Sequence, residues 1–397
     1  MNTRKRYKRF LVFIKTSPGL KIILFFVGVI FLSSFIVFII ERNRNEGFVS
    51  FFDSLWWTIV TISTVGYGDR LPNTIPGRIF AILTIFLGVA MMGTITGRIA
   101  SMLMERQMKE EKGLMDYKTM SGHFIVCGWK QEMNSVLREI LIRNPEHDPS
   151  TTILVNRAPV EEINSIRSDP FFKGIHYVHG DFIEEPVLKR AGIRGASKIL
   201  VMADYHTEGD LQQIDSKTVM AVMSIKNMNK KAYVCAEILD TKFEKYLKIS
   251  HCDEVLLSRE FSRFMLASAS SGEGLSHVVK SLLSKHSTAR IKTIDFPESL
   301  VGKTYEQLLE HFRKNQTLQL VGLLENTGNI MLRKKEALRE AQKNPDISKL
   351  VPELRNVKTL IANEPIINPP LDYGIKRYTK AIAICGTTFS PSPENAS

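Results

Sequence analysis

The six residues Thr64-Val65-Gly66-Tyr67-Gly68-Asp69 carry the clearest chemistry in this sequence. Gly66 and Gly68 supply backbone conformations that residues with side chains adopt only under strain, so successive carbonyl groups can point to one side. The Thr64 hydroxyl can add one more ring of oxygens. Carbonyls arranged in this way replace the hydration shell of a monovalent cation. The alternative is a chance glycine-rich turn between two strands, and the flanking sequence decides against it.

Two long apolar stretches flank this run. Ile22–Ile40 and Ile79–Gly97 contain no charged residue, and each can cross a bilayer at about 1.5 Å per residue. A cleavable signal peptide is the alternative for the first stretch, but Glu41–Arg44 offers no small-residue cleavage site. Gly47–Ser63 is apolar and aromatic but too short to cross. It therefore predicts a half-buried helix that leads into the glycine-rich run.

The charged residues before the first stretch are all basic: Arg4, Lys5, Arg6, Lys8, Arg9, Lys15 and Lys21. The positive-inside rule then predicts a cytoplasmic N-terminus, and two spans return the chain to the cytoplasm. We expect a multi-pass protein of the cell membrane with both termini in the cytoplasm. Part of the net charge of +12 belongs to this membrane-facing segment, so it requires no nucleic-acid partner.

With this arrangement the chain resembles the potassium-channel superfamily. The resemblance implies that Thr64–Asp69 is a selectivity filter that holds potassium ions, and that Trp56 and Trp57 pack behind Tyr67. An interfacial aromatic belt is the other explanation for the two tryptophans. One filter segment per chain encloses nothing, so the resemblance implies a homotetramer in a lipid bilayer.

The second span contains a candidate gate. Gly88 lies in its middle, where glycine costs about 1 kcal/mol relative to alanine. It aligns with the hinge glycine of the two-span channels that the chain resembles, and close helix packing explains it equally well. Met92 and Ile95 follow at helical spacing and predict a face that lines the inner mouth of the pore.

Beyond residue 121, short apolar runs alternate with amphipathic stretches, which is typical of a parallel sheet wound with helices. The predicted strands are His123–Cys127, Thr151–Asn156, Ile175–His179, Lys198–Ala203, Ala232–Ala236 and Glu254–Leu257. The predicted helices include Met133–Arg143, Glu185–Ala191, Ile214–Asn227 and Lys242–Ser250. Six strands in this rhythm look like an α/β Rossmann-type lobe.

Three segments, Phe124–Trp129, His179–Asp181 and Ile367–Tyr373, resemble the RCK family, regulators of potassium conductance. With the filter upstream, the chain is similar to two-span, ligand-gated channels of the MthK type, in which a ring of such domains expands to open the inner helices. The predicted parts are a basic N-terminus (1–21), a pore (22–97), a linker (98–121), an RCK N-lobe (122–258), crossover helices (259–287), a smaller α+β C-lobe (288–389) with an insertion near 334–363, and a tail (390–397).

A nucleotide site is one expectation for the Rossmann-type lobe. The dinucleotide fingerprint needs three glycines after the first strand and an acid after the second. Here only Gly128 is present, and the second strand ends at Asn156-Arg157, so tightly bound NAD is disfavoured. Lys130 and Arg157 can still hold a looser phosphate-bearing ligand such as an adenine nucleotide. The residues of this candidate site are Gly128, Trp129, Lys130, Asn156, Arg157 and Asp181.

A calcium or other divalent-cation site is the second expectation. Such ions take six to eight oxygen ligands, and the resemblance implies that Asp204 and Glu237 match two ligands of related channels. The glutamate that the family has two residues after Glu237 is Leu239 here. That departure predicts weak binding.

The combined patterns predict a potassium-selective channel that is gated by a small-molecule or ion ligand on its RCK ring, and not an enzyme. A cation channel of relaxed selectivity is the nearer alternative. A membrane-tethered, nucleotide-dependent oxidoreductase is the remoter one, because the glycine fingerprint is degraded. The histidines form no metal-ligand pair, and the four cysteines show no paired spacing.

Overall fold

The computed structural model describes residues 18–205, 210–284, 287, 289–313, 318–342, 352, 354–358 and 360–386, with side chains from residue 23 onward. Most of the predicted basic N-terminus, the tail at 390–397 and part of the insertion predicted at 334–363 lie outside these residues. The chain divides into two compact units, Met1–Met108 and Lys109–Ser397.

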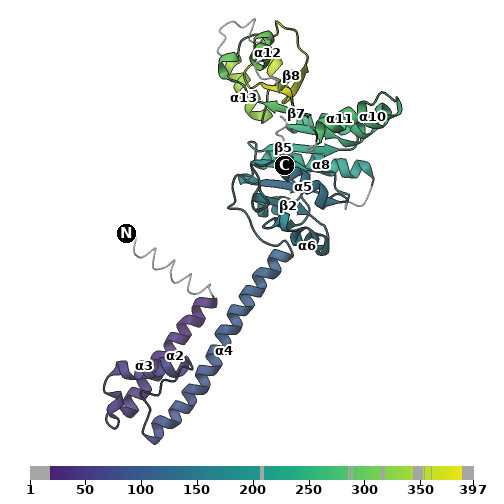
Figure 1. Ribbon diagram of the computed structural model, residues 1–397. Coiled ribbons are helices and arrows are strands. Elements are labelled where there is room, and N and C mark those ends of the chain that lie inside the picture. The colour runs from purple at the N-terminus through teal and green to yellow at the C-terminus, as the bar shows by residue number, and fades with distance from the viewer. Residues whose placement is uncertain are drawn as a thin grey trace, which may run out of the picture. The chain divides into compact units, whose positions relative to one another are not determined.

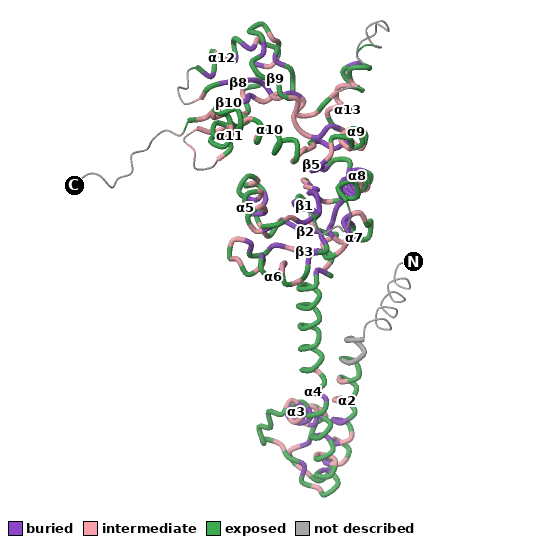
Figure 2. Tube along the Cα trace, turned by 90° about the vertical axis from the view of Figure 1, so that its right-hand side faces the viewer, coloured by how far each residue is buried: buried purple, intermediate pink, exposed green. Residues whose placement is uncertain are grey.

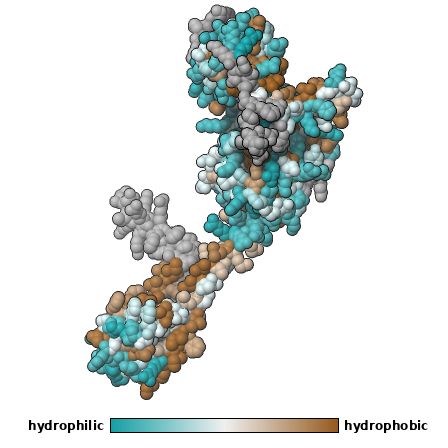
Figure 3. Space-filling view, viewed as in Figure 1, coloured by the Kyte–Doolittle hydropathy of each residue, from teal (hydrophilic) through white to brown (hydrophobic). Residues whose placement is uncertain are grey.

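The first unit contains two helices that are long and apolar enough to cross a membrane, as predicted. They are α2 (Pro18–Glu41) and α4 (Ile75–Glu111), and between them lie the short η1 (Glu46–Phe48) and the helix α3 (Phe51–Ile62). Apolar side chains cover much of the visible surface of this unit (Figure 3). Helix α4 continues to Glu111, well past the predicted end of the span at Gly97, so the first part of the predicted linker is helical.

Aromatic side chains pack α3 against α2. The Phe51 ring lies 6.5 Å from that of Phe31 and 6.0 Å from that of Phe38. Val37, Phe48 and Trp57 form the buried core of this unit. Protein contacts thereby hold α3, which is too short to cross a bilayer, against α2.

The second unit begins with a six-stranded parallel sheet in the order β3-β2-β1-β4-β5-β6 (Figure 1). Its strands are β1 (Phe124–Cys127), β2 (Thr152–Asn156), β3 (His176–His179), β4 (Lys198–Val201), β5 (Tyr233–Ile238) and β6 (Glu254–Leu257). This is the Rossmann strand order, so the predicted fold of this lobe is confirmed. The helices are α5 (Met133–Arg143), α6 (Val160–Ser168), α7 (Glu185–Arg190), α8 (Leu211–Met228) and α9 (Glu244–Ile249).

Both faces of this sheet are buried at its centre, where every residue of β1 and β2 is buried (Figure 2). Phe124 and Val126 face a core that α5 and α6 complete. Ile125 and Cys127, on the opposite face, pack in a core with residues of α7 and α8. Burial on both faces explains why the strands read as nearly continuous apolar runs. Helix α6 was not among the helices predicted, because it offers only Ile163 and Ile166 as buried positions.

The remainder of the second unit is a helical hairpin followed by a smaller lobe. The hairpin is α10 (Ser258–Ser270) and α11 (Leu275–Leu283), as predicted, with Gly272 and Gly274 in the turn at φ +73° and +72°. The lobe has an antiparallel sheet in the order β7-β10-β8-β9, and its helices include α12 and α13. Their bounds are β7 (Ala289–Ile294), α12 (Tyr305–Arg313), β8 (Leu318–Glu325), α13 (Ile330–Ala341), β9 (Glu364–Ile367) and β10 (Lys380–Gly386).

The sequence patterns predicted no strand at β9 or at β10. Strand β10 is central and pairs with both β7 and β8, while β9 lies at the edge beside β8. Each is a short apolar run without a neighbouring strand in sequence, so its pairing depends on distant partners. Helix α13 begins at Ile330, before the predicted start of the insertion.

Candidate functional site

The predicted filter segment, Thr64–Asp69, is tied to the start of α3, the predicted pore helix. A capping box opens α3: the Ser50 hydroxyl accepts from the Asp53 amide, and the Asp53 carboxylate accepts from the Ser50 amide. Asp53 also forms an ion pair of 3.1 Å with Arg70, which follows the filter. Arg70 donates in addition to the Gly47 carbonyl. These contacts hold the two ends of the re-entrant segment together.

The sign of the backbone angle φ alternates along the predicted filter segment. Thr64, Gly66 and Gly68 have φ values of +61°, +59° and +73°, whereas Val65 and Tyr67 are not among the residues with positive φ. Alternation of this kind is compatible with successive carbonyls that point to the same side, which stays a prediction for this segment. A positive φ is strained for the β-branched Thr64, and such strain is typical of functional sites.

Trp56 supports the filter from behind. Its ring stacks on that of Tyr67 at 6.0 Å with an interplanar angle of 6°, and its indole N–H donates to the Asp69 carboxylate at 2.9 Å. Trp57 does not share this role, contrary to the expectation. Its ring packs edge-on against Phe48, because neighbouring residues point in different directions on a helix.

A buried carboxylate that the sequence patterns did not identify joins α2 to α4. Glu41 is fully buried and accepts from the Asn45 side chain at 2.9 Å and from the amides of Asn73 and Thr74 at 3.0 and 3.1 Å. A Cβ at Gly77 would lie 2.0 Å from a Glu41 oxygen. Glycine at this position therefore lets α4 start directly beside the carboxylate.

Gly88 packs against the end of the pore helix. A Cβ there would lie 2.9 Å from the Ile62 Cα, at the residue where α3 ends. This contact supports the packing explanation for Gly88, and its role as a hinge stays a prediction. Met92 is exposed and Ile95 is half-buried within a single chain, and their place on the inner pore stays a prediction.

The second candidate site lies at the carboxyl edge of the parallel sheet. Gly128 follows β1 with φ +94°, and a Cβ there would lie 2.7 Å from the Met202 carbonyl oxygen, just beyond β4. The glycine is therefore needed where the strand order reverses, whether or not a phosphate binds.

Two lysines neutralise the two carboxylates that were predicted to bind a cation. Lys130 Nζ lies 2.5 Å from Glu237 Oε1, and the other Glu237 oxygen accepts from the Ala203 amide at 3.1 Å. Lys217 Nζ lies 2.9 Å from Asp204 Oδ2. Glu237 and Asp204 are both only 2% exposed. Their charges are therefore balanced by protein groups.

The ion pairs continue toward β3. Lys217 also lies 3.4 Å from Asp181, which in turn lies 3.4 Å from Arg157. Arg157 also pairs with Glu184 at 3.2 Å. The predicted ligand groups Arg157 and Asp181 are thus brought together, but as partners of each other.

These residues do not fit a resident calcium ion. Among the described residues, which omit 206–209, no group of three or more potential metal ligands occurs. Leu239 is buried, and its amide donates to Asp215 at 2.9 Å. Calcium needs six to eight oxygens, and here the two expected carboxylates already bind lysines. Burial raises the pKa of Asp215, the acceptor of the hydrogen bond from the Leu239 amide.

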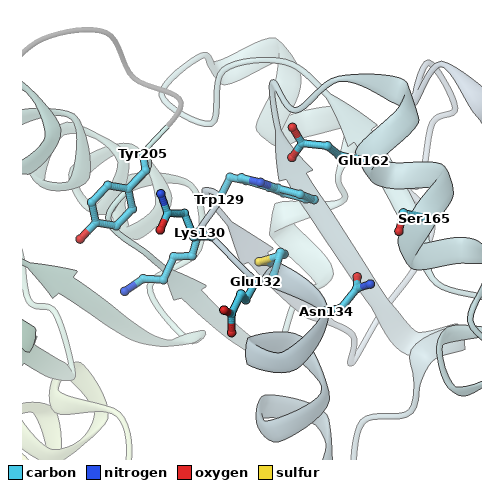
Figure 4. Close-up of a pocket in the computed structure, with 9 residues that line it drawn as sticks. Trp129, Lys130, Glu132, Asn134, Glu162, Ser165 and Tyr205 are labelled. Carbon is cyan, nitrogen blue, oxygen red and sulfur yellow. The ribbon is translucent and has the colours of Figure 1, made fainter.

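The fit to a nucleotide is partial. A cleft of about 410 Å³ lies beside the loop after β1, with Trp129, Lys130 and Tyr205 on one side and Glu162 and Ser165 of α6 on the other (Figure 4). Met133 is buried in the core at the position of the third fingerprint glycine. Asn156 is buried too, and its side chain accepts from the Ala158 amide at 3.0 Å. No carboxylate therefore stands at the end of β2 to bind a ribose.

The sequence patterns also missed Lys217. It lies on the buried side of α8, with 9% exposure. A lysine within the apolar face of an amphipathic helix is a usable signal, because buried ammonium groups need a charged partner. The sequence alone does not identify Asp204 or Asp181 as that partner.

Two family models match the chain. Residues 21–105 match a model described as an ion channel, and residues 119–236 match one described as a calcium-activated potassium channel slowpoke-like RCK domain. Both describe channels and not enzymes. The first match ends within α4, and the second begins in the segment that follows this helix.

Individual relatives agree with these matches. The calcium-gated potassium channel TvoK of Thermoplasma volcanium is 27% identical over 293 residues, covering 73% of this chain and 80% of its own length. The putative potassium channel protein YugO of Bacillus subtilis is 28% identical over 316 residues, covering 77% and 89%. Among solved structures, the GsuK channel aligns with a TM-score of 0.46 and 14% identity over 93% of this chain. The chain spans 57% of the length of that structure.

Proposed function

We propose that this chain is a subunit of a ligand-gated potassium channel with two membrane-spanning helices and an RCK domain, and that four copies surround one pore. The alternating backbone of Thr64–Gly68 is the observation that supports potassium selectivity. Each chain contributes one filter segment, and a ring of carbonyls around an axis needs four. In this proposal Asp69 lies at the outer end of the filter, where it is held by Trp56.

The proposed orientation places both termini in the cytoplasm of the cell. It rests on the basic residues that precede α2, because positive side chains stay on the cytoplasmic side of a membrane. The RCK domain then faces soluble cytoplasmic ligands.

Potassium flux through liposomes that contain the purified full chain tests the selectivity. A reversal potential close to the potassium equilibrium potential in mixed potassium and sodium is the expected result. Gly66→Ala places a side chain at φ +59° and should abolish this selectivity, whereas Gly93→Ala, which meets no atom within 4 Å, should preserve it. Equal permeation of the two ions in the wild type would favour the cation channel of relaxed selectivity.

We further propose that the gating ligand acts at the carboxyl edge of the parallel sheet. Lys130, Glu237, Lys217 and Asp204 supply four charges there, at the point where the strand order reverses. An adenine nucleotide in the cleft beside Trp129 requires Lys130 to exchange Glu237 for a phosphate. A divalent cation requires both lysines to leave their carboxylates. Either ligand therefore alters the Lys130–Glu237 pair.

Open probability measured with millimolar calcium and, separately, with ADP distinguishes the two ligands. Asp204→Asn combined with Glu237→Gln should remove a calcium response. Lys130→Gln should remove a response to ADP and leave a calcium response in place. Calcium sensitivity that survives the double substitution would show that the ion binds elsewhere.

A further inference from the structure

The segment that joins α4 to β1 contains no helix or strand from residue 112 to residue 123, yet it is bonded to the lobe along its length. All the residues of this contact belong to the second unit. Its first contact is made by the last turn of α4, where the Glu110 carbonyl accepts from Arg167 of α6 at 3.1 Å. The C-terminal end of the pore-lining helix is thus bound to the lobe before the segment begins.

Gly113 fits closely against the end of β3. Its carbonyl accepts from the His179 amide at 2.9 Å, and its φ is +64°. A Cβ at this position would lie 2.5 Å from the His179 nitrogen and 2.6 Å from a ring carbon of Tyr177. Only glycine satisfies both the conformation and the contact.

Arg190, the last residue of α7, binds both partners of this contact. One guanidinium nitrogen donates to the Gly113 carbonyl at 3.1 Å, and another donates to the His179 carbonyl at 2.6 Å. The Arg190 backbone carbonyl also accepts from the Tyr117 amide at 2.7 Å. A planar, forked side chain is suited to two carbonyls at once, which a single ammonium group is not.

The rest of the segment is equally close to the lobe. The Tyr117 ring lies 4.6 Å from that of His176. Cβ atoms built at Gly192 and Gly195 would lie 2.5 and 2.2 Å from the carbonyl oxygens of Tyr117 and Met120. The Gly122 amide donates to the Gly195 carbonyl at 2.7 Å.

The same strand end also reaches the candidate ligand edge. Asp181, two residues after His179, pairs with Lys217 at 3.4 Å, and Lys217 binds Asp204. Gly180 donates its amide to the Asn156 carbonyl at 3.0 Å. A rearrangement of the Asp181–Lys217–Asp204 ion pairs therefore affects the backbone at the end of β3, to which Gly113 is bonded.

We propose that Gly113 and Arg190 form a rigid joint through which the RCK domain moves α4. A flexible chain of 12 residues has a root-mean-square span of roughly 20 Å and would absorb small domain movements. A segment that is bonded to β3 and α7 passes such a movement directly to the helix. Arg190 is a positioning residue in this mechanism, because it acts on α4 through the Gly113 carbonyl. The inference about gating rests on the proposed ligand control.

Hydrogen exchange of the full-length channel tests the joint without any ligand. The amides of Tyr117, Gly122 and His179 should exchange as slowly as those of β1. Arg190→Gln should release the amides around Gly113 and leave β1 protected. Lys189→Gln is the matched control, since Lys189 is the adjacent residue on α7 and forms an ion pair with the exposed Glu185. Rapid exchange of the segment in the wild type would overturn the proposal.

Single-channel recordings test the coupling, with millimolar calcium and ADP as probes. Coupled sites typically change an equilibrium by about 5- to 150-fold, and Arg190→Gln and Gly113→Ala should reduce the ligand-induced change to less than about 2-fold. Arg190→Lys should restore part of it, and Lys189→Gln should leave it intact. A full response in both Arg190→Gln and Gly113→Ala would refute the joint. A wild type that responds to neither probe would count against the proposed ligand control, and hydrogen exchange would then decide the joint by itself.

Discussion

Replacing Lys130 by methionine tests how much the buried Lys130–Glu237 ion pair contributes to the stability of the RCK domain. Methionine keeps the unbranched stem and removes the ammonium group that lies 2.5 Å from Glu237. Of the residues that the structure describes, the Ala203 amide would then be the remaining donor to the Glu237 carboxylate, which is 2% exposed. Loss of one partner of a buried pair costs about 3–5 kcal/mol. The Lys130 side chain is 24% exposed, so water moderates the loss and we expect the lower end of that range.

A loss of about 3 kcal/mol corresponds to a decrease in melting temperature of roughly 6–12 °C for a domain of this size. Thermal unfolding of the full-length channel in detergent measures it, with Trp129 reporting on the lobe. Glu237→Gln should cost less, because the partly exposed Lys130 ammonium can turn to water. The double variant should recover part of the Lys130→Met loss, since no buried charge remains unpaired.

Calcium provides a second readout of the same variant. Without the competing ammonium group, millimolar calcium should raise the melting temperature of Lys130→Met more than that of the wild type. A melting temperature for Lys130→Met within about 2 °C of the wild type would refute the reasoning, because 1 kcal/mol already corresponds to 2–4 °C.

Three further outcomes are expected. Gly88→Ala should lower the melting temperature of the assembled pore, because its Cβ would meet Ile62 at 2.9 Å, whereas Gly93→Ala should not lower it. Equal melting temperatures of Gly88→Ala and the wild type, together with an altered open probability, would favour the hinge. Burial lowers the pKa of His123, so the unfolded chain binds a proton at this residue more readily than the folded chain does. The stability of the RCK domain should therefore be full above about pH 6.5 and fall below it. His123→Gln should flatten that fall in melting curves recorded against pH. Asp253→Asn leaves the buried Lys226 without a carboxylate and weakens the bond to the Ile330 amide, so limited proteolysis should cut near α13 sooner than in the wild type; unchanged cleavage would contradict this.

The sequence by itself determined those features whose physical cause is local. Two uncharged stretches of membrane length, a glycine-rich run between them and six short apolar strands separated by amphipathic helices each depend on neighbouring residues. The parallel sheet follows from that alternation, and its strand order agrees with the Rossmann-type prediction. The positive φ values at Gly66 and Gly68 follow from the residue type.

Only the tertiary structure decided which charged groups are paired. Asp204 and Glu237 fit a cation-binding pattern in sequence, but Lys217 and Lys130 approach them from other elements of the lobe. The pairing of β10 with β7 and β8 likewise joins runs that are distant in the chain. Periodicity records which face of an element is buried and carries no information about what lies opposite.

The contact between Gly113 and Arg190 shows the same limit most clearly. In sequence, the stretch after α4 is a polar segment without a recognisable period, and nothing in it identifies β3 or α7 as its partner. The structure bonds the Gly113 carbonyl to His179 and Arg190 because the backbone folds back at a positive φ beside the end of β3. Backbone hydrogen bonds between remote segments depend on the position of the chain in space and not on side-chain type, so only the folded lobe determines them.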